Sequence, residues 1–399
     1  MKCIQYYLNN ESNVYVTLLD ASQAFDRVNY VKLFRLLRAR KLPAVILRFL
    51  IVFYTNQNIR VRWRSSISIS CTISNGVKQG GVLSPILFTI YIDELLNELR
   101  KSGLGCHIGQ QFCGSLGYAD DVLLLAPTLF SLRKMLDICS KYATSYNVLF
   151  NASKSKLLYF GQAASRPTLS PVNFMGATIE LVSHEKHLGN VIGQNCIKYK
   201  IEDCINIFTG RTNMIRTHFC HARYDVIYDI FKTYCMPLYG SQLWDYGDRN
   251  TDRFYVNWRK AVRKLFNLPN RTHSALLPYI CDDVNPFIQL LRRVISFNKG
   301  LSNTENELSA LCYKLAMQGS GSATSNNISI MSFLWSVPRE DVHSIKRNIC
   351  PEIFNNEVAI CASVVRDLLN MKHINKYFHN NVLFNNEEID FMVHILCTQ

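Results

Sequence analysis

The chain has 399 residues, 48% hydrophobic and 19% charged, a composition typical of a folded globular protein and not of a disordered one. Its net charge of +14 is uneven, because residues 1–300 hold 37 basic and 20 acidic side chains whereas residues 301–399 hold 7 and 10. We therefore expect residues 1–300 to bind a polyanion; the alternative is that the charge serves only solubility.

The most apolar stretch, 45–54, contains Arg48 and is too short to span a bilayer, and no apolar run follows Met1. We therefore expect neither a membrane span nor a signal peptide.

The first elements in chain order are β and then helical. The β-rich run Val14–Leu19 ends at Asp20 and predicts a strand. Apolar residues at helical spacing predict one helix near 30–37 and another from Pro43 to about Tyr54. Residues 58–64 and 67–74 then alternate like a β-hairpin joined at Ser65-Ser66.

The next segments surround a pair of acids. After a loop at Gly76–Gly81 and a helix at Pro85–Arg100, two apolar runs flank Asp120-Asp121 and predict strand, tight turn, strand. A helix is expected near 129–146. Short strands are expected near 156–160, 173–181 and 187–192.

From about residue 200 the pattern is helical, so the order indicates an α+β fold with an all-α second part. The Gly/Ser/Asn-rich stretch Gln318–Ser329 predicts a linker.

The fourteen cysteines include no C-x-x-C pair, and His218, Cys220 and His221 lack the spacing of a zinc site. We therefore expect reduced, mostly buried cysteines and no structural zinc.

Three aspartates stand at the ends of apolar strands: Asp20, Asp120 and Asp121. An Asp-Asp turn puts two like charges side by side, which costs free energy unless a cation neutralises them. Hard oxygen ligands of this kind suit Mg²⁺. The alternative is that aspartate is simply a favourable turn residue, an explanation that suits one aspartate better than two.

Five segments resemble, in order and with family-like gaps, motifs A to E of reverse transcriptases from LINE-type (non-LTR) retrotransposons. They are Val14–Asn29, Asn75–Phe88, Gly117–Pro127, Asn151–Phe160 and His187–Gly193.

A softer likeness to jockey-like elements continues through Tyr239–Asp245 and Trp258–Leu277. The resemblance implies a right-hand polymerase palm, an antiparallel sheet backed by helices, followed by a helical thumb and a helical C-terminal region. The implied limits are 1–195 for the palm with remnant fingers, 196–315 for the thumb and connection, 316–330 for a linker and 331–399 for the C-terminal region.

The resemblance also implies roles for single residues. Asp20, Asp120 and Asp121 match the catalytic aspartates, with Asp20 and Asp120 holding two Mg²⁺ ions (or Mn²⁺) and Asp121 supporting them. Lys154 matches a lysine that protonates the leaving pyrophosphate, with a plain surface lysine as the alternative. The residues implied to contact the incoming nucleotide are Ala21, Phe25, Gln79, Gly80 and Gly81. For Phe25 the alternative is a core phenylalanine, and for the glycine pair a plain turn.

Two further groups are implied to hold nucleic acid. His187, Leu188 and Gly189 match the primer grip, which lies beneath the primer 3′ end in the family. In the second group, Tyr255, Trp258, Val262, Leu265 and Phe266 form an apolar helical stripe, and Arg259, Lys260, Arg263 and Lys264 lie away from it. If this helix belongs to a thumb, these basic residues contact duplex phosphates. Arg60, Arg62 and Arg64 form a second basic stripe with the same expected role. For each stripe the alternative is a solvated basic face.

Motif A begins about fifteen residues after Met1, whereas a fingers region of well over a hundred residues precedes it in the family. The resemblance therefore implies an RNA-directed DNA polymerase that lacks its front part here. It acts on an RNA template, a DNA primer and deoxynucleoside triphosphates, without a membrane partner, in the nucleus and cytoplasm. The alternative is an inactive or repurposed fragment that at most binds nucleic acid. A group II intron maturase is disfavoured, because the sequence after motif E looks LINE-like.

Overall fold

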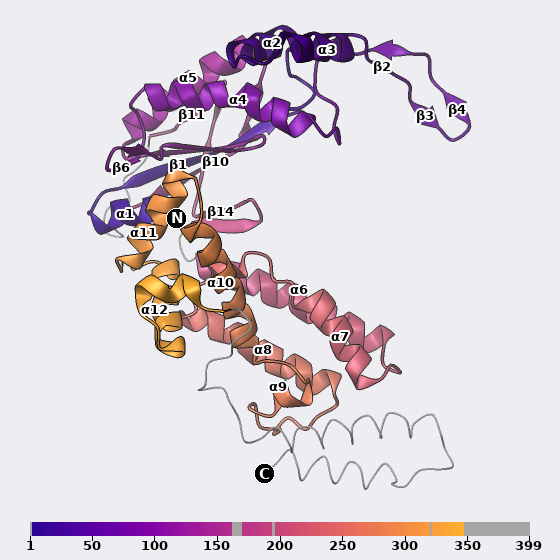
Figure 1. The fold of residues 1–399 in the computed structure, drawn as a ribbon, viewed down its shortest axis with the longest axis vertical. Helices are drawn as coiled ribbons and strands as arrows, with labels where there is room; N and C mark the ends of the chain where they lie inside the picture. Colours follow the sequence, from indigo (N-terminus) through magenta and orange to yellow (C-terminus); the bar gives the residue numbers. More distant parts are fainter. Residues whose placement is uncertain (1, 162–169, 194–195, 320, 347–399) are drawn as a thin grey trace. The chain divides into compact units, whose positions relative to one another are not determined.

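The computed structural model describes residues 2–161, 170–193, 196–319 and 321–346 (Figure 1). The chain divides into two compact units. Unit 1 comprises Met1–His187 with Ile192–Gln194, and unit 2 comprises Leu188–Val191 with Asn195–Gln399. The expected C-terminal region lies mostly outside the described residues, since nothing is described beyond residue 346.

Unit 1 is built on a five-stranded sheet with strand order β13-β10-β1-β9-β8. The central strand β1 is buried on both faces over Val14–Leu19, which explains why its sequence is a continuous apolar run instead of an alternating one. The strands are β1 (Val14–Ser22), β8 (Ser115–Tyr118), β9 (Asp121–Ala126), β10 (Leu149–Phe160) and β13 (Glu180–Val182).

The expectation of a purely antiparallel sheet is wrong at one edge. β9 and β10 pair antiparallel with β1, and β8 pairs antiparallel with β9, but β13 runs parallel to β10. The connection between β10 and β13, residues 161–179, is long enough for the crossover that a parallel pair needs.

Helices α4 (Ser84–Lys101) and α5 (Leu129–Tyr146) lie over one face of this sheet and share its apolar core (Figure 1). The side chain of Thr128 caps α5 by accepting a hydrogen bond from the Ser131 amide, and Asn147 ends the helix in the left-handed conformation. The other helices of unit 1 are α1 (Lys2–Asn9), α2 (Tyr30–Ala39) and α3 (Ala44–Thr55).

Short ladders complete unit 1. The expected hairpin after α3 is confirmed, but it turns at Arg64-Ser65 and consists of two separate ladders, β2 with β5 and β3 with β4. The expected single strand at 187–192 is wrong, because Leu188 and Gly189 have left-handed φ angles and join β14 to β15 in a tight turn. The short strands are β2 (Asn58–Ile59), β3 (Arg62–Trp63), β4 (Ser66–Ile67), β5 (Cys71–Thr72), β6 (His107–Ile108), β7 (Gln111–Phe112), β11 (Asn173–Phe174), β12 (Ala177–Thr178), β14 (His184–His187) and β15 (Asn190–Gly193).

From residue 196 to residue 346 the described residues of unit 2 form helices joined by turns, and they have their own apolar core. Trp258, Val262 and Leu265 of α8 and Phe266, the residue after the helix, are buried in this core. The predicted apolar stripe is thereby confirmed. The helices are α6 (Cys196–His218), α7 (Tyr224–Cys235), α8 (Arg249–Leu265), α9 (Leu277–Ile280), α10 (Pro286–Ser302), α11 (Glu307–Met317) and α12 (Ala323–Trp335), with short 3₁₀ turns at Ser241–Leu243 and Arg339–Ser344. None of the helices in the described ranges combines the length and apolarity that crossing a bilayer requires.

The linker expected at 316–330 is wrong, since α12 begins at Ala323 and buries Ile328 and Met331 completely. Asn327, a residue that suggested a loop, is fully buried: its amide nitrogen donates to the Trp244 carbonyl at 2.7 Å, and its side-chain oxygen accepts from the Tyr246 amide at 3.0 Å. For Asn327, the polar side chain therefore serves buried hydrogen bonds and not solvation.

Candidate active site

The three predicted catalytic aspartates lie at the same end of the sheet in unit 1. β1 pairs with β9 as far as Leu19 opposite Val122, so Asp20 and Asp121 are the residues next to this last pair, and they interact electrostatically. Directly opposed residues of antiparallel strands lie roughly 5 Å apart and face the same side. Asp120 occupies the two-residue turn between Tyr118 and Asp121, which pair with each other.

That turn has a strained backbone. Ala119, its first residue, has a φ of 51°, a left-handed value that a two-residue hairpin turn requires but that an alanine adopts at a cost of about 1 kcal/mol. The predicted strand, tight turn, strand arrangement is confirmed, but the turn is Ala119-Asp120 and not Asp120-Asp121, because Asp121 already belongs to β9.

The electrostatics at this strand end link four side chains. The pKa of Asp121 is raised by burial, and Asp120 and Asp20 raise it further by repulsion, against the attraction of His187, which lowers it. The pKa of His187 is lowered by burial and raised by Asp121. His187 thus stands beside the carboxylates, a position that the likeness to motif E did not reveal.

A bulge in β10 supports Asp20 from the other side. Leu18 pairs with Lys156 and Asp20 with Asn151, so Leu19 alone stands opposite the four residues 152–155. The buried Ser155 hydroxyl accepts from the Asp20 amide at 3.3 Å and donates to the Asn151 carbonyl at 2.8 Å. Ser155 is a positioning residue that the sequence interpretation missed, because its partner is 135 residues away.

Lys154 lies in the same bulge, with its side chain exposed. The side-chain oxygen of Asn151 accepts from the amides of Ser153 and Lys154 at 3.1 and 3.2 Å, and so folds the bulge into a turn. The bulge therefore sets the positions of Asp20 and Lys154 together.

The loop at 75–81 is fastened to the segment that follows β1. The Gly76 amide donates to the Val28 carbonyl at 2.8 Å, and the Val77 amide donates to the Phe25 carbonyl at 2.7 Å. Gly76 has a φ of +88°, and a β-carbon there would lie 2.7 Å from the Asp26 carbonyl oxygen, so this close approach requires glycine. Sequence reasoning singled out Gly80 and Gly81 and passed over Gly76.

The residues expected to contact a nucleotide differ in how exposed they are. Gln79, Gly80 and Gly81 are at the surface or nearly so, and the Gln79 amide nitrogen lies 3.3 Å from Asp26 Oδ1. Phe25 is half-buried and stacks on Phe88 with ring centroids 4.9 Å apart, so part of its surface belongs to the core. Ala21 is buried and presents no side-chain surface.

Within the described ranges, no three His, Cys, Asp or Glu side chains are already grouped closely enough to hold a metal ion. The backbone brings Asp20, Asp120 and Asp121 to one end of the sheet, but their carboxylates do not converge on one point. Their donor chemistry nevertheless suits Mg²⁺, because adjacent carboxylates repel each other and a hard cation relieves that repulsion.

In unit 2, the turn at Leu188-Gly189 is held by residues from distant segments. The Gly189 carbonyl accepts from Lys200 Nζ at 2.6 Å, and a β-carbon at Gly189 would lie 2.9 Å from the ring of Tyr239. Lys200 Nζ in turn lies over the Tyr239 ring, 5.6 Å from its centroid. Leu188 itself is 38% exposed.

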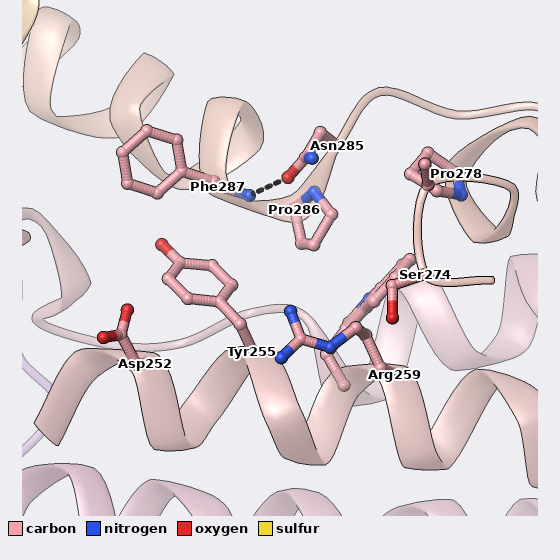
Figure 2. Close-up of a pocket in the computed structure, with 10 residues that line it drawn as sticks. Asp252, Tyr255, Arg259, Ser274, Pro278, Asn285, Pro286 and Phe287 are labelled. Atoms are coloured by element: carbon pink, nitrogen blue, oxygen red, sulfur yellow. Dashed lines mark hydrogen bonds between the residues drawn. The ribbon is translucent and has the colours of Figure 1, made fainter. Parts of the chain in front are cut away.

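The basic residues of α8 are not equivalent. Lys260 and Lys264 are exposed, whereas the guanidinium of Arg263 donates to the Thr272 carbonyl and to Ser274, and so holds a loop of its own unit. Arg259 lines a cavity of about 480 Å³ beside Tyr255, and across it stand Pro286 and Phe287 at the start of α10 (Figure 2).

Comparison with known proteins gives a family for the first part of the chain. A family model described as reverse transcriptase (RNA-dependent DNA polymerase) matches residues 2–179. The chain is 31% identical over 140 residues to the Pol polyprotein from the type-2 retrotransposable element R2DM of Drosophila melanogaster, covering 35% of this chain and 13% of that protein. It is 29% identical over 187 residues to the RNA-directed DNA polymerase from mobile element jockey of Drosophila funebris, covering 44% of this chain and 19% of that protein.

Among solved structures, apo telomerase from Candida tropicalis is similar with a TM-score of 0.39 and 12% identity, covering 78% of this chain and 55% of that one, a likeness too weak to carry an argument. The aligned stretches make up less than a quarter of the two retrotransposon proteins. Residues 2–179 are therefore similar to the reverse transcriptase (RNA-dependent DNA polymerase) family and to proteins of the retrotransposable elements R2DM and jockey.

Proposed function

We propose that the chain carries the polymerase centre of an RNA-directed DNA polymerase, which extends a DNA primer along an RNA template with deoxynucleoside triphosphates. The observation that supports this most directly is the β1–β9 register, whose last pair is Leu19 with Val122, next to Asp20 and to the Ala119-Asp120 turn. In this proposal unit 1 is a palm and the helical unit 2 contains a thumb, and the protein acts in the nucleus and cytoplasm.

Asp20 and Asp120 would hold two Mg²⁺ ions, or Mn²⁺, with Asp121 in support. Such a pair of ions activates a primer 3′-hydroxyl and stabilises the leaving pyrophosphate. Burial and the neighbouring carboxylates raise the pKa of Asp121, and bound cations would favour its charged form.

The remaining residues bind, orient or donate a proton. Lys154, exposed on its bulge, supplies a proton to the pyrophosphate, a contribution of roughly 10²–10⁴-fold for a general acid. The half-buried ring of Phe25 lies under the incoming sugar, and the loop around Gln79 approaches the base pair. His187 and the turn at Leu188-Gly189 support the primer end, and Arg259, Lys260 and Lys264 contact duplex phosphates.

Primer extension on poly(rA)/oligo(dT) with Mg²⁺ and dTTP tests the proposal. We expect incorporation by the wild-type chain and a loss on the order of 10²-fold or more in Asp120→Asn. The reason is that the two metal ions lower the activation barrier by several kcal/mol. The matched control is Asp137→Asn, which removes an exposed acid on α5 and leaves activity unchanged.

Equal activity in Asp120→Asn and wild type would refute the assignment of the site. No incorporation by the wild-type chain, together with salt-sensitive binding of the duplex, would instead favour a fragment that only binds nucleic acid.

A further inference from the structure

The segment between α3 and α4 forms a two-stranded ribbon that extends from the end of α3, away from the sheet of unit 1 (Figure 1). We call residues 58–72 the β-ribbon. Its two ladders are joined by hydrogen bonds between Val61 and Ser68, whose amides donate to Ser68 Oγ and to the Val61 carbonyl, both at 2.9 Å. The β-ribbon is thus a regular, hydrogen-bonded element.

Nothing in the described part of unit 1 covers either face of the β-ribbon. All four of its short strands are exposed, and Trp63 is 74% exposed. An isolated two-stranded ribbon is only marginally stable in water, and large apolar side chains at such exposure mark interaction sites.

The charge on the β-ribbon is of one sign. Residues 27–92 hold eleven basic side chains and no acidic one, and three of the eleven are Arg60, Arg62 and Arg64. Within the described residues, none of these three guanidinium groups forms an ion pair or a hydrogen bond. Arg60 and Arg62 are alternate residues of one extended segment and so share a face, and Arg64 follows them in the turn, where its φ is 54°. The β-ribbon therefore carries three unpaired cations within five residues, a charge density that suits a phosphate backbone.

The foot of the β-ribbon opens into a cavity of about 710 Å³. Asn58, Ile59 and Ile73 line it on the ribbon side, and the loop from Asn75 to Gln79 lines it on the other, together with Asp26. Amide and apolar side chains both line it, together with Asp26 and Lys78, a combination that suits a base with polar edges and apolar faces. The cavity connects the β-ribbon to the loop that the polymerase proposal places at the nucleotide.

We propose that the β-ribbon and the cavity at its foot bind single-stranded nucleic acid, namely the template before it is copied. The identification of this strand as the template rests on the proposed polymerase function; the binding site itself does not. Phosphates lie along Arg60, Arg62 and Arg64, and one base enters the cavity. Trp63, on the opposite face of the thin ribbon, stacks on another base, which requires an unpaired strand because duplex bases are already stacked.

The test compares two triple variants that each remove three positive charges. The first is Arg60→Gln, Arg62→Gln and Arg64→Gln. The matched control is Arg100→Gln, Lys101→Gln and Lys141→Gln, three exposed positions on α4 and α5 of the same unit. Both sets are at the surface, so both variants should fold, which circular dichroism checks.

Binding of a fluorescent oligo(rA) is followed by anisotropy across a salt series, without nucleotides. Each phosphate contact on a single strand contributes about 0.7 to the slope of log K against log salt, so loss of three contacts lowers the slope by about 2. We expect affinity to fall at least tenfold in the β-ribbon variant and less than about twofold in the control. Trp63→Ala should weaken binding without changing the slope.

Several outcomes overturn the proposal. Unchanged binding in the β-ribbon variant shows that the strand lies elsewhere, and equal losses in the two variants show an effect of net charge alone. If binding of a poly(rA)/oligo(dT) duplex falls as much as that of the single strand, the surface binds duplex and the single-strand assignment is wrong.

Failure of the polymerase proposal gives a different result. Asp120→Asn should bind oligo(rA) like the wild type, since the assay needs no catalysis. A wild-type chain that incorporates no nucleotide but loses binding in the β-ribbon variant would refute the polymerase proposal and leave the β-ribbon as a nucleic-acid site.

Discussion

At Gly76 a single missing side chain allows two segments to meet, and the effect of adding a methyl group can be predicted. Gly76→Ala combines a left-handed φ with a β-carbon 2.7 Å from the Asp26 carbonyl, so we expect a loss of about 2–5 kcal/mol in the free energy of unfolding. Gly103 has a similar φ of +68° but nothing within 4 Å of its β-carbon. Gly103→Ala should therefore cost only about 1–2 kcal/mol.

Urea unfolding of the two variants measures both values, provided that the slope with denaturant is unchanged. Equal losses would show that backbone strain alone matters and that Gly76 makes no close approach. The same experiment bears on the site, because the loop at 75–81 is attached to Phe25 and Val28 through this contact.

At the scale of one element, α12 depends on a buried amide. Asn327→Ala leaves the Trp244 carbonyl and the Tyr246 amide without partners in the core, so we expect a loss of about 2–4 kcal/mol in the free energy of unfolding. The neighbouring Asn326 contacts Asp245 in a partly buried setting, and Asn326→Ala should cost about 0.5–1.5 kcal/mol.

Thermal and urea unfolding of the pair tests this. Tryptophan fluorescence in a Trp63→Phe background assigns the change to unit 2, which holds the other three tryptophans. If the two asparagines prove equivalent, Asn327 is not the bond that holds α12 in the core. The result would also show whether a Gly/Ser/Asn-rich stretch can be a structural helix here.

At the scale of the whole molecule, the acids at the strand end couple stability to pH and to divalent ions. Because the pKa of Asp121 is raised, the folded state holds its proton more tightly than the unfolded state, and stability falls as the pH rises from the ordinary carboxyl pKa through the folded value. Without divalent ions at pH 7.5, Asp121→Asn should therefore raise Tm by a few degrees at most, and the gain should shrink as the pH approaches the ordinary value.

Divalent ions should stabilise the wild type more than the variant. Mg²⁺ at ten times its Kd should stabilise the wild type by about 1.4 kcal/mol and Asp121→Asn by less. Differential scanning fluorimetry over a pH and Mg²⁺ grid records both trends, with Asp137→Asn as the control. A Tm of the wild type that does not respond to Mg²⁺ would count against a metal site at this strand end.

Local patterns in the sequence were enough for the mixed order of strands and helices, the apolar stripe of α8 and the hairpin around Asp120-Asp121. Periodicity and turn chemistry act over a few residues, so one sequence suffices to see them. The likeness to reverse transcriptases likewise came from short segments, and the match over residues 2–179 agrees with it. The catalytic and binding roles of single residues stay predictions.

Tertiary structure alone decided which distant residues meet. The bulge that joins Ser155 to Asp20, the approach of Gly76 to Asp26, the burial of Asn327 and the loop contact of Arg263 each depend on partners that no local pattern identifies. The parallel pairing of β13 is of the same kind, because strand order follows from the burial of whole faces and not from the strand's own residues. Sequence by itself thus determined most elements and the likeness to reverse transcriptases, and packing determined the geometry at the strand end.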